Sequence, residues 1–217
     1  LNVNFTSQNL QGQSIMEPGA LRKIAQVMTL GATSYTVAFS APGGNETVNL
    51  EGNIASMSFD GDTFMPAMMN PEDMSRALAD GFALDGSLGY TDAKTNFSFT
   101  DGEDAMDGSS SADSAVIGVR MNKDLLEYNG TSKGVNFNLS GAEIPFPVVA
   151  GLGEVAFNLL MPVAKSDDES DFAFGLTLGD FATSDMIWSM LDAGNVLPRD
   201  PATISLDLTG KAKMLVE

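Results

Sequence analysis

The C-terminal stretch ISLDLTGKAKMLVE, residues 204–217, alternates apolar or small side chains at even positions with mostly polar ones at odd positions. A period of two is that of a β-strand with one dry face and one wet face. From Ile204 to Val216 such a strand would run about 40 Å, at ~3.3 Å per residue. The usual strand has only ~5–6 residues. A dry face this long must be covered by helices, by a second sheet or by a bound hydrophobic molecule.

Similar alternation recurs through most of the chain, in segments joined by short glycine- and asparagine-rich turns. Because the connections are short, they favour antiparallel pairing over βαβ units. We therefore expect a mainly β fold, a long-stranded, largely antiparallel curved sheet or half-barrel with about three short helices. We expect a single domain over residues 1–217, with a possible subdivision near 101–114.

The three expected helices cover residues 17–31, 70–81 and 182–194. The first has apolar residues at helical spacing and a glycine at its end. The second has Asn70 as a candidate cap, Pro71 in its first turn and Gly81 at its end. The third begins at Ser184, ends at Gly194, and is expected to bury Ile187, Met190 and Leu191.

Four irregular features are expected between the strands. Residues 101–114, DGEDAMDGSSSADS, are polar and low in complexity, which predicts a loop. Asn129-Gly130 predicts a tight hairpin turn. The apolar parity changes after Ile54, which predicts a β-bulge near Ala55. The two prolines of EIPFPVVAG predict a connector or an edge strand.

Composition excludes several classes of function. The chain has 29 Asp and Glu against 11 Lys and Arg, a net charge of −18, which disfavours nucleic acid and anionic membrane surfaces. It has no Cys and no His, which excludes disulfides, Cys-ligated zinc and Ser-His-Asp or Cys-His catalysis within one chain. No apolar run has the ~18 residues of a membrane span. No signal segment precedes Leu1, so we expect that a targeting peptide has been removed.

Acidic clusters offer two weak calcium candidates: one is Asp60 with Asp62, and the other comprises Asp101, Glu103, Asp104 and Asp107. Carboxylates are suitable ligands, but neither cluster has the spacing of a known calcium loop. A solvated acidic surface is the alternative. With so many acids, a carboxylate pair for hydrolysis can always be found, so that pattern is unspecific. We expect no cofactor.

Five Asn-x-Ser/Thr triplets begin at Asn4, Asn45, Asn96, Asn129 and Asn138. They suit glycosylation where the machinery exists. Several lie in or beside expected strands, where Asn on the wet face is the alternative.

The chain contains thirteen Met and thirteen Phe, whose adaptable apolar side chains can either fill an ordinary core or line a site for a hydrophobic ligand. The candidate ligand-binding residues alternate on two expected strands near the C-terminus: Phe172, Phe174, Leu176, Leu206, Leu208 and Met214. Arg199, in the turn LPRDPA, either pairs locally or anchors an anion.

Three C-terminal segments, EIPFPV, NLLMPVAKSDDESDFAFGLTLGDFATSDMIWSMLD and VLPRDPATISLDLTGKAKM, resemble an alphaproteobacterial family of unknown function, the one numbered 2125. The resemblance covers about residues 82–217. It implies an exported envelope protein with a cleavable leader. The family is distantly similar to envelope proteins whose curved sheets form a lipid-carrying groove, although this chain is shorter and shows no membrane anchor.

The leading hypothesis is therefore a non-enzymatic periplasmic or exported protein that binds a lipid or other hydrophobic molecule on the concave apolar face of its sheet. A structural or interaction subunit of the cell envelope, docking on an envelope protein partner through a sheet edge, is the alternative. A carboxylate-dependent hydrolase is a third. Around Gly210, Lys211 and Ala212 we expect a bend or a specific contact.

Overall fold

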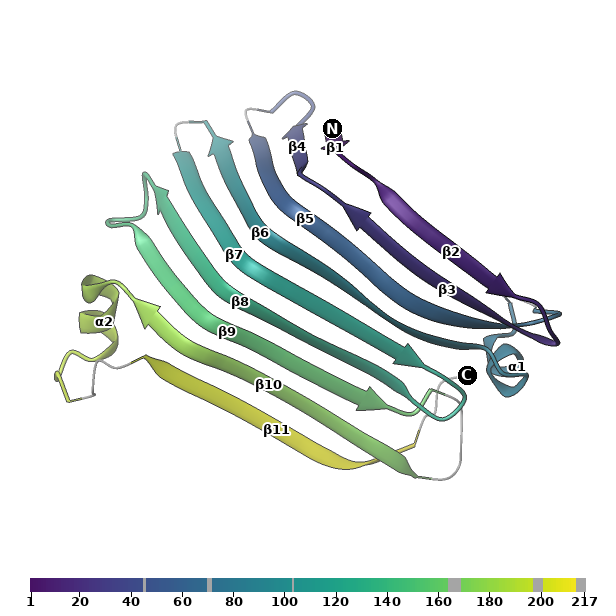
Figure 1. Cartoon of the computed structure of the whole chain (residues 1–217). Coiled ribbons are helices and arrows are strands. Elements are labelled where there is room, and N and C mark those ends of the chain that lie inside the picture. Colours follow the sequence, from purple (N-terminus) through teal and green to yellow (C-terminus); the bar gives the residue numbers. More distant parts are fainter. Residues whose placement is uncertain (45, 70–71, 103, 164–168, 197–200, 214–217) are drawn as a thin grey trace.

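The computed structural model describes the chain except for residues 45, 70–71, 103, 164–168, 197–200 and 214–217. The chain forms one open antiparallel sheet of eleven strands, which does not close into a barrel (Figure 1). The strands are β1 (Asn2–Ser7), β2 (Gln11–Glu17), β3 (Leu21–Leu30), β4 (Thr33–Ser40), β5 (Thr47–Pro66), β6 (Ala83–Asp101), β7 (Asp104–Met121), β8 (Leu126–Gly141), β9 (Val148–Met161), β10 (Ser170–Thr183) and β11 (Ala202–Ala212).

Neighbours in sequence are neighbours in the sheet from β5 to β11. At the other end, β3 and β4 both pair with β5, and β1 and β2 pair with β4 and β3 respectively. The registers of β3 and β4 against β5 are continuous, since Leu30 pairs with Met57 and Thr33 with Ile54. Each of the pairs β1/β2 and β3/β4 is therefore one long strand with a break in its middle.

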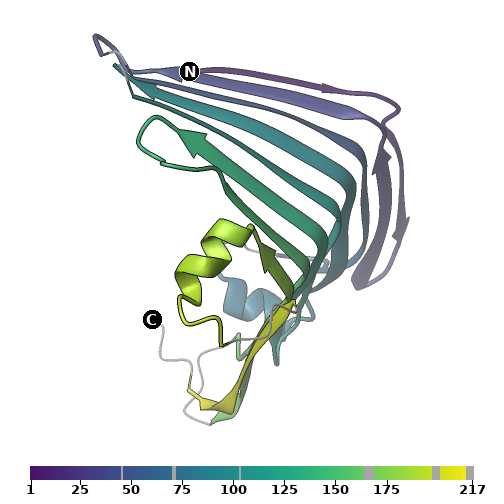
Figure 2. The same cartoon turned by 90° about the vertical axis from the view of Figure 1, so that its left-hand side faces the viewer.

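A crease crosses the sheet at the level of those breaks. On both sides of Asp92 the register between β5 and β6 is the same, yet the pair between Ala55 and Asp92 is missing. The next strands show the same gap in their pairing: Asp92 has no partner on β7, where Asp113 would lie, and Asp113 has none on β8, where Gly134 would lie. Gly134 is likewise unpaired with β9. Left-handed backbone angles mark this line at Asn9 (φ 53°), Asp92 (φ 48°), Gly134 (φ 61°) and Asp180 (φ 53°). In Figure 2 the strands bend midway along their length, giving the sheet a half-barrel shape.

The crease also resets the alternation of faces. Along β5, half-buried and exposed residues alternate, but Ala55 and Ser56 are both exposed. On β6 the consecutive residues Thr91 and Asp92 are likewise both exposed. Because a non-extended residue interrupts the two-residue period, apolar residues three positions apart lie on one face across the crease. The bulge predicted near Ala55 is thus a crease shared by neighbouring strands, with no shift of register.

The sheet has almost no conventional core. Ala77, Leu78 and Ala115 are the buried hydrophobic residues of the described chain. The accessible surface is 13923 Å², whereas a compact monomer of this size would expose about 9,600 Å². The sheet is therefore a single layer over most of its extent.

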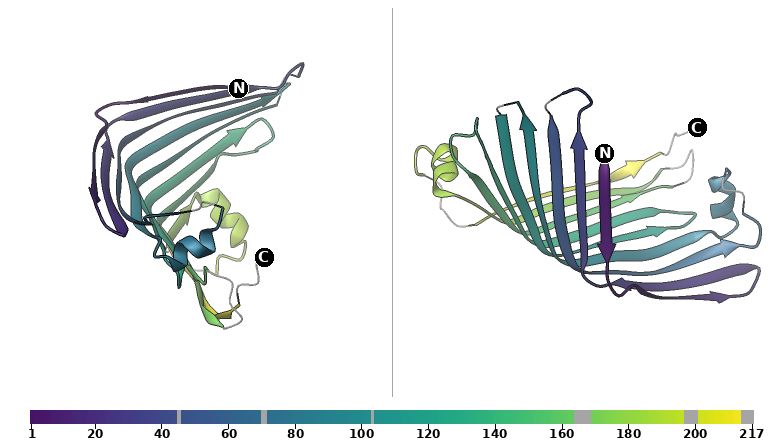
Figure 3. Two further views of the ribbon diagram at one scale, coloured as in Figure 1. Left: turned by 90° about the vertical axis from the view of Figure 1, so that its right-hand side faces the viewer. Right: turned by 90° about the horizontal axis from the view of Figure 1, so that it is seen from above.

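The described residues contain two short helices, α1 (Met74–Ala79) and α2 (Asp185–Leu191), where three were expected. Figures 2 and 3 show both on the inner side of the curved sheet. The α1 cap is Asp73, which accepts a hydrogen bond from the Arg76 backbone N–H. At α2, Ser184 holds the cap position without a side-chain hydrogen bond. Contrary to expectation, Met190 and Leu191 are 66% and 64% exposed.

The predicted helix at 17–31 is wrong, because residues 21–30 form strand β3. Ile24, Met28 and Leu30 fit an alternating strand as well as a helical face. The long strand β5 offers a partner for every residue from Leu21 to Leu30. Backbone pairing along β5 therefore outweighs a weak helical pattern.

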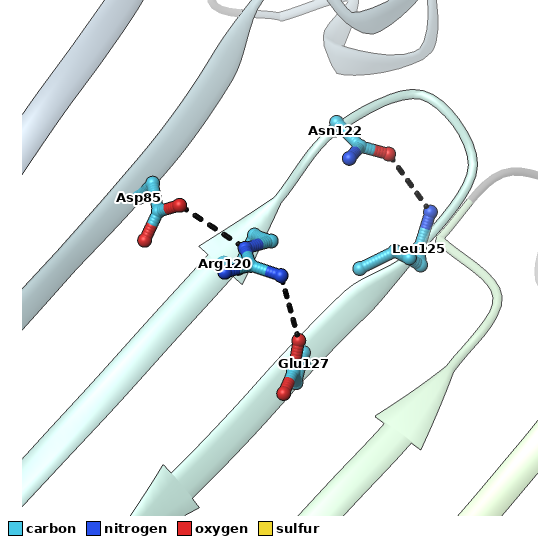
Figure 4. Close-up of polar contacts among 5 residues, drawn as sticks. All are labelled: Asp85, Arg120, Asn122, Leu125 and Glu127. Carbon is cyan, nitrogen blue, oxygen red and sulfur yellow. Dashed lines mark hydrogen bonds and ion pairs between the residues drawn. The ribbon is translucent and has the colours of Figure 1, made fainter.

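Two further predictions are wrong. Residues 104–114 are not a loop but the first part of β7, so the proposed subdivision near 101–114 falls within the sheet. Asn129-Gly130 is not a turn but lies inside β8, and the β7–β8 hairpin turns at residues 122–125 instead. There the Asn122 side chain accepts hydrogen bonds from the backbone N–H groups of Asp124 and Leu125. Figure 4 shows the bond with Leu125. Of the predicted connector EIPFPVVAG, residues 143–147 do connect β8 to β9, whereas residues 148–151 begin β9, which lies between β8 and β10 and is not an edge strand.

Candidate ligand-binding face

One face of the sheet below the crease is apolar from strand to strand. A row of directly paired residues runs across seven strands: Phe59, Leu88, Ile117, Gly130, Phe157, Leu176 and Leu206. A second row, two residues along each strand, contains Val119, Tyr128, Leu159, Phe174 and Leu208. These rows form a continuous hydrophobic surface.

The same face stays apolar above the crease. There the paired row contains Val37, Leu50, Phe97, Gly108, Leu139 and Val148. The rings of Phe97 and Phe137 stack with their centroids 6.1 Å apart. We call the combined surface on both sides of the crease the apolar face.

Glycines lie beneath large side chains on this face. A Cβ added to Gly130 would collide with the ring of Phe157, and one added to Gly108 would collide with the ring of Phe97. Tyr35 covers Gly52 in the same way. Glycine at these positions lets each ring lie against the backbone of the neighbouring strand.

The sequence-predicted ligand residues of β10 and β11 lie together on the apolar face. Phe174 pairs with Leu208 and Leu176 pairs with Leu206, while Phe172 pairs with Gly210. Leu206 and Leu208 are 46% and 49% exposed, and the β10 residues are half-buried. They are therefore not covered by helices. Met214 and Arg199 lie outside the described residues, so their predicted roles stay predictions.

Exposure is general across this face. Leu88 and Ile117 are 42% and 46% exposed, and Ile204 is 61% exposed. Apolar patches on soluble monomers rarely exceed a few hundred Å². Below the crease the apolar face crosses the seven strands from β5 to β11, at ~4.8 Å per strand, and therefore covers a larger area than such a patch.

The opposite face is polar and partly ionic below the crease. The Arg120 guanidinium lies between Asp85 (3.1 Å) and Glu127 (3.5 Å), which come from the two neighbouring strands (Figure 4). Lys23 forms an ion pair with Asp62 at 2.8 Å. The hydrogen bond and the charge of Asp62 raise the pKa of Lys23.

Above the crease the polar face is rich in amides and hydroxyls. An open groove of about 690 Å³ there is lined by residues that include Thr36, Asn49, Asn96, Ser109 and Asn138. Asn4, Asn96 and Asn138 belong to one cross-strand row on this face. This placement fits the wet-face interpretation of those triplets.

The calcium candidates are not assembled into a metal site in the described part of the chain, where no three Asp or Glu side chains are close enough to hold an ion. Asp101 and Asp104 face each other where β6 and β7 meet, and Asp62 is engaged by Lys23. Glu103 lies outside the described residues. No described helix is long and apolar enough to cross a membrane.

Sequence reasoning missed the crease, although its signal is present in the sequence. Apolar residues three apart occur on three strands, at Ile54 and Met57 of β5, at Tyr90 and Ala93 of β6, and at Leu152 and Val155 of β9. The parity change after Ile54 alone indicates a bulge in one strand. Its repetition on other strands indicates a crease across the sheet.

No protein-family model, curated protein or solved structure matches this chain. The geometry and the charge of the chain are therefore the main basis for assigning a function.

Proposed function

We propose that this protein binds a lipid on the apolar face and performs no catalysis of its own. The observation that carries the proposal is the half-exposed apolar face itself, which no second sheet covers in the described structure. Every Å² of apolar surface removed from water contributes roughly 25 cal/mol. A ligand with long hydrocarbon chains would bury much of this surface and so bind favourably. The fold would not have to change, because the surface is already exposed.

The concave side of the half-barrel is the side we assign to the lipid. At the crease, two consecutive residues of β5, Ala55 and Ser56, have their side chains on the polar side. On the apolar side no side chain lies between those of Ile54 and Met57. The outside of a bend has the longer path and accommodates the additional side chains. The apolar face would then line the inner, partly enclosed surface.

The charge of the protein indicates which lipid headgroups it can bind. A net charge of −18 repels anionic headgroups, so a neutral or zwitterionic lipid fits best. We further propose an exported or periplasmic location, which the resemblance to the family numbered 2125 supports. A structural role through a sheet edge is the second candidate, favoured by the outer edge of β11, which no other strand of the described residues pairs with.

Two adjacent residues of β7 give a matched test. Ile117 is 46% exposed and lies on the apolar face, whereas Val116 is 51% exposed and lies on the polar face beside Gly89. With dansyl-labelled phosphatidylethanolamine as the probe, Ile117→Glu should reduce the fluorescence enhancement at least several-fold. Val116→Glu should leave it near the wild-type value. Equal effects of the two substitutions, or no enhancement with the wild type, would overturn the proposal.

A further inference from the structure

The outer edge of β11 is apolar and unpaired in the described structure. Ile204, Leu206 and Leu208 are 61%, 46% and 49% exposed, and β10 is the only described strand beside them. An open strand edge presents a row of backbone donors and acceptors, which another strand can complete.

Gly210 leaves open space at this edge of the described structure. Every other glycine within a described strand has at least one atom within 4 Å of the place where a Cβ would lie, whereas Gly210 has none. Gly12 on the opposite edge strand, β2, is filled by the side chain of Met28. Elsewhere on the apolar face, a large side chain from one of the two neighbouring strands covers each of Gly52, Gly108 and Gly130. Phe172 on β10 pairs with Gly210 but leaves it uncovered, so the space above Gly210 is open to a side chain from a strand beyond β11.

The charges of β11 indicate which strand would pair with its outer edge. Asp207 and Lys211 lie symmetrically on either side of Thr209. If a second β11 runs antiparallel with Thr209 opposite Thr209, Asp207 of each strand faces Lys211 of the other. The same register places Leu208 over the partner's empty Gly210. Opposite charges directly across two strands stabilise the pair, and apolar residues stay on the apolar side.

We propose that two copies of this chain pair through β11 around a two-fold axis at Thr209, which extends the apolar face across both copies. Lys211, already 3.1 Å from Asp171 on β10, would then lie between two carboxylates. The register centred on Asp207 would place two like charges opposite each other, which is unfavourable. This proposal does not depend on lipid binding.

Disulfide trapping tests the pairing directly, because the chain has no cysteine of its own. Residues directly opposite in an antiparallel ladder have Cα atoms about 4.5–5.5 Å apart, within the range of a disulfide. Thr209→Cys should therefore give a covalent dimer on mild oxidation. Asn4→Cys, on the opposite edge of the sheet, is the exposed control and should remain monomeric. Equal trapping of the two variants would overturn the proposal.

Charge reversal tests the register. In ~0.15 M salt, where the screening length is about 8 Å, the repulsion between the two acidic copies is reduced. Asp207→Lys alone and Lys211→Asp alone should each lower the dimer fraction in sedimentation at least several-fold. The double variant should restore it. If the wild type is monomeric at every accessible concentration, or if the single reversals change nothing, the proposed dimer is wrong.

Discussion

The ring of Phe157 on β9 lies directly over Gly130 on β8, in the space that a Cβ at position 130 would occupy. This relationship explains why the sequence signal for a turn at Asn129-Gly130 was misleading. The glycine is required for close approach of a neighbouring ring, while the chain at this point is extended.

Replacing Gly130 with Ala should destabilise the protein by about 1–3 kcal/mol, because the ring of Phe157 must move off the sheet. Urea denaturation measures the change in the free energy of unfolding. Gly179→Ala is the matched control: a Cβ there would lie 3.6 Å from its nearest neighbouring atoms, an ordinary van der Waals contact, so the change should stay within about 0.5 kcal/mol. Equal losses for the two variants would contradict this account of the glycines.

The crease gives a second prediction, at Asp92. Its φ of 48° is left-handed, which costs ordinary residues roughly 1–2 kcal/mol and β-branched residues more. Asp92→Val should therefore destabilise the protein by about 1–2 kcal/mol. Asp92→Gly should be neutral within about 1 kcal/mol, because glycine accepts this angle but loses more entropy on folding. If Val were tolerated as well as Gly in thermal or urea unfolding, the crease would not depend on this residue.

The sequence predicts the fold class well, because it depends on a repeated local pattern. Alternation such as Phe172, Phe174 and Leu176 gives the long strands, and short connections give antiparallel order. The last strand, β11, spans Ala202–Ala212, which is shorter than the predicted stretch 204–216, and residues 214–217 lie outside the described residues. Strands of 20, 19 and 18 residues, β5 to β7, show that long strands are a general property of the sheet.

Features that depend on a neighbouring strand were not predictable in this way. Ser109, Ser110 and Ser111 have low strand propensity, yet each pairs with a residue of β6. The helical spacing of Ile24 and Met28 is equally compatible with alternation once β5 lies beside them. In both cases tertiary pairing determines the structure, and local propensity is secondary.

The candidate face was predicted only near the C-terminus, at Phe174, Leu176, Leu206 and Leu208. Its extension to Phe59, Leu88 and the other strands required the register. The change in the alternation at the crease keeps one face apolar along the whole strand. It could be recognised only from the backbone angles of the structure.

The ion pair between Lys23 and Asp62 gives a prediction on pH. Because the pKa of Lys23 is raised in the folded protein, its contribution to stability is fully present below the unfolded value of about 10.4. That contribution is lost as pH rises through the higher folded pKa. The free energy of unfolding of the wild type should therefore fall more steeply than that of Lys23→Met above about pH 10.5. Parallel pH curves for the two proteins would show that the pair does not contribute to stability.

Native mass spectrometry of protein purified without detergent tests the central claim most directly. We predict that the wild type and Val116→Glu carry adducts with the mass of a neutral or zwitterionic lipid, and that Ile117→Glu loses them. A wild-type protein free of any lipid adduct, or an Ile117→Glu protein that retains it fully, would contradict the account.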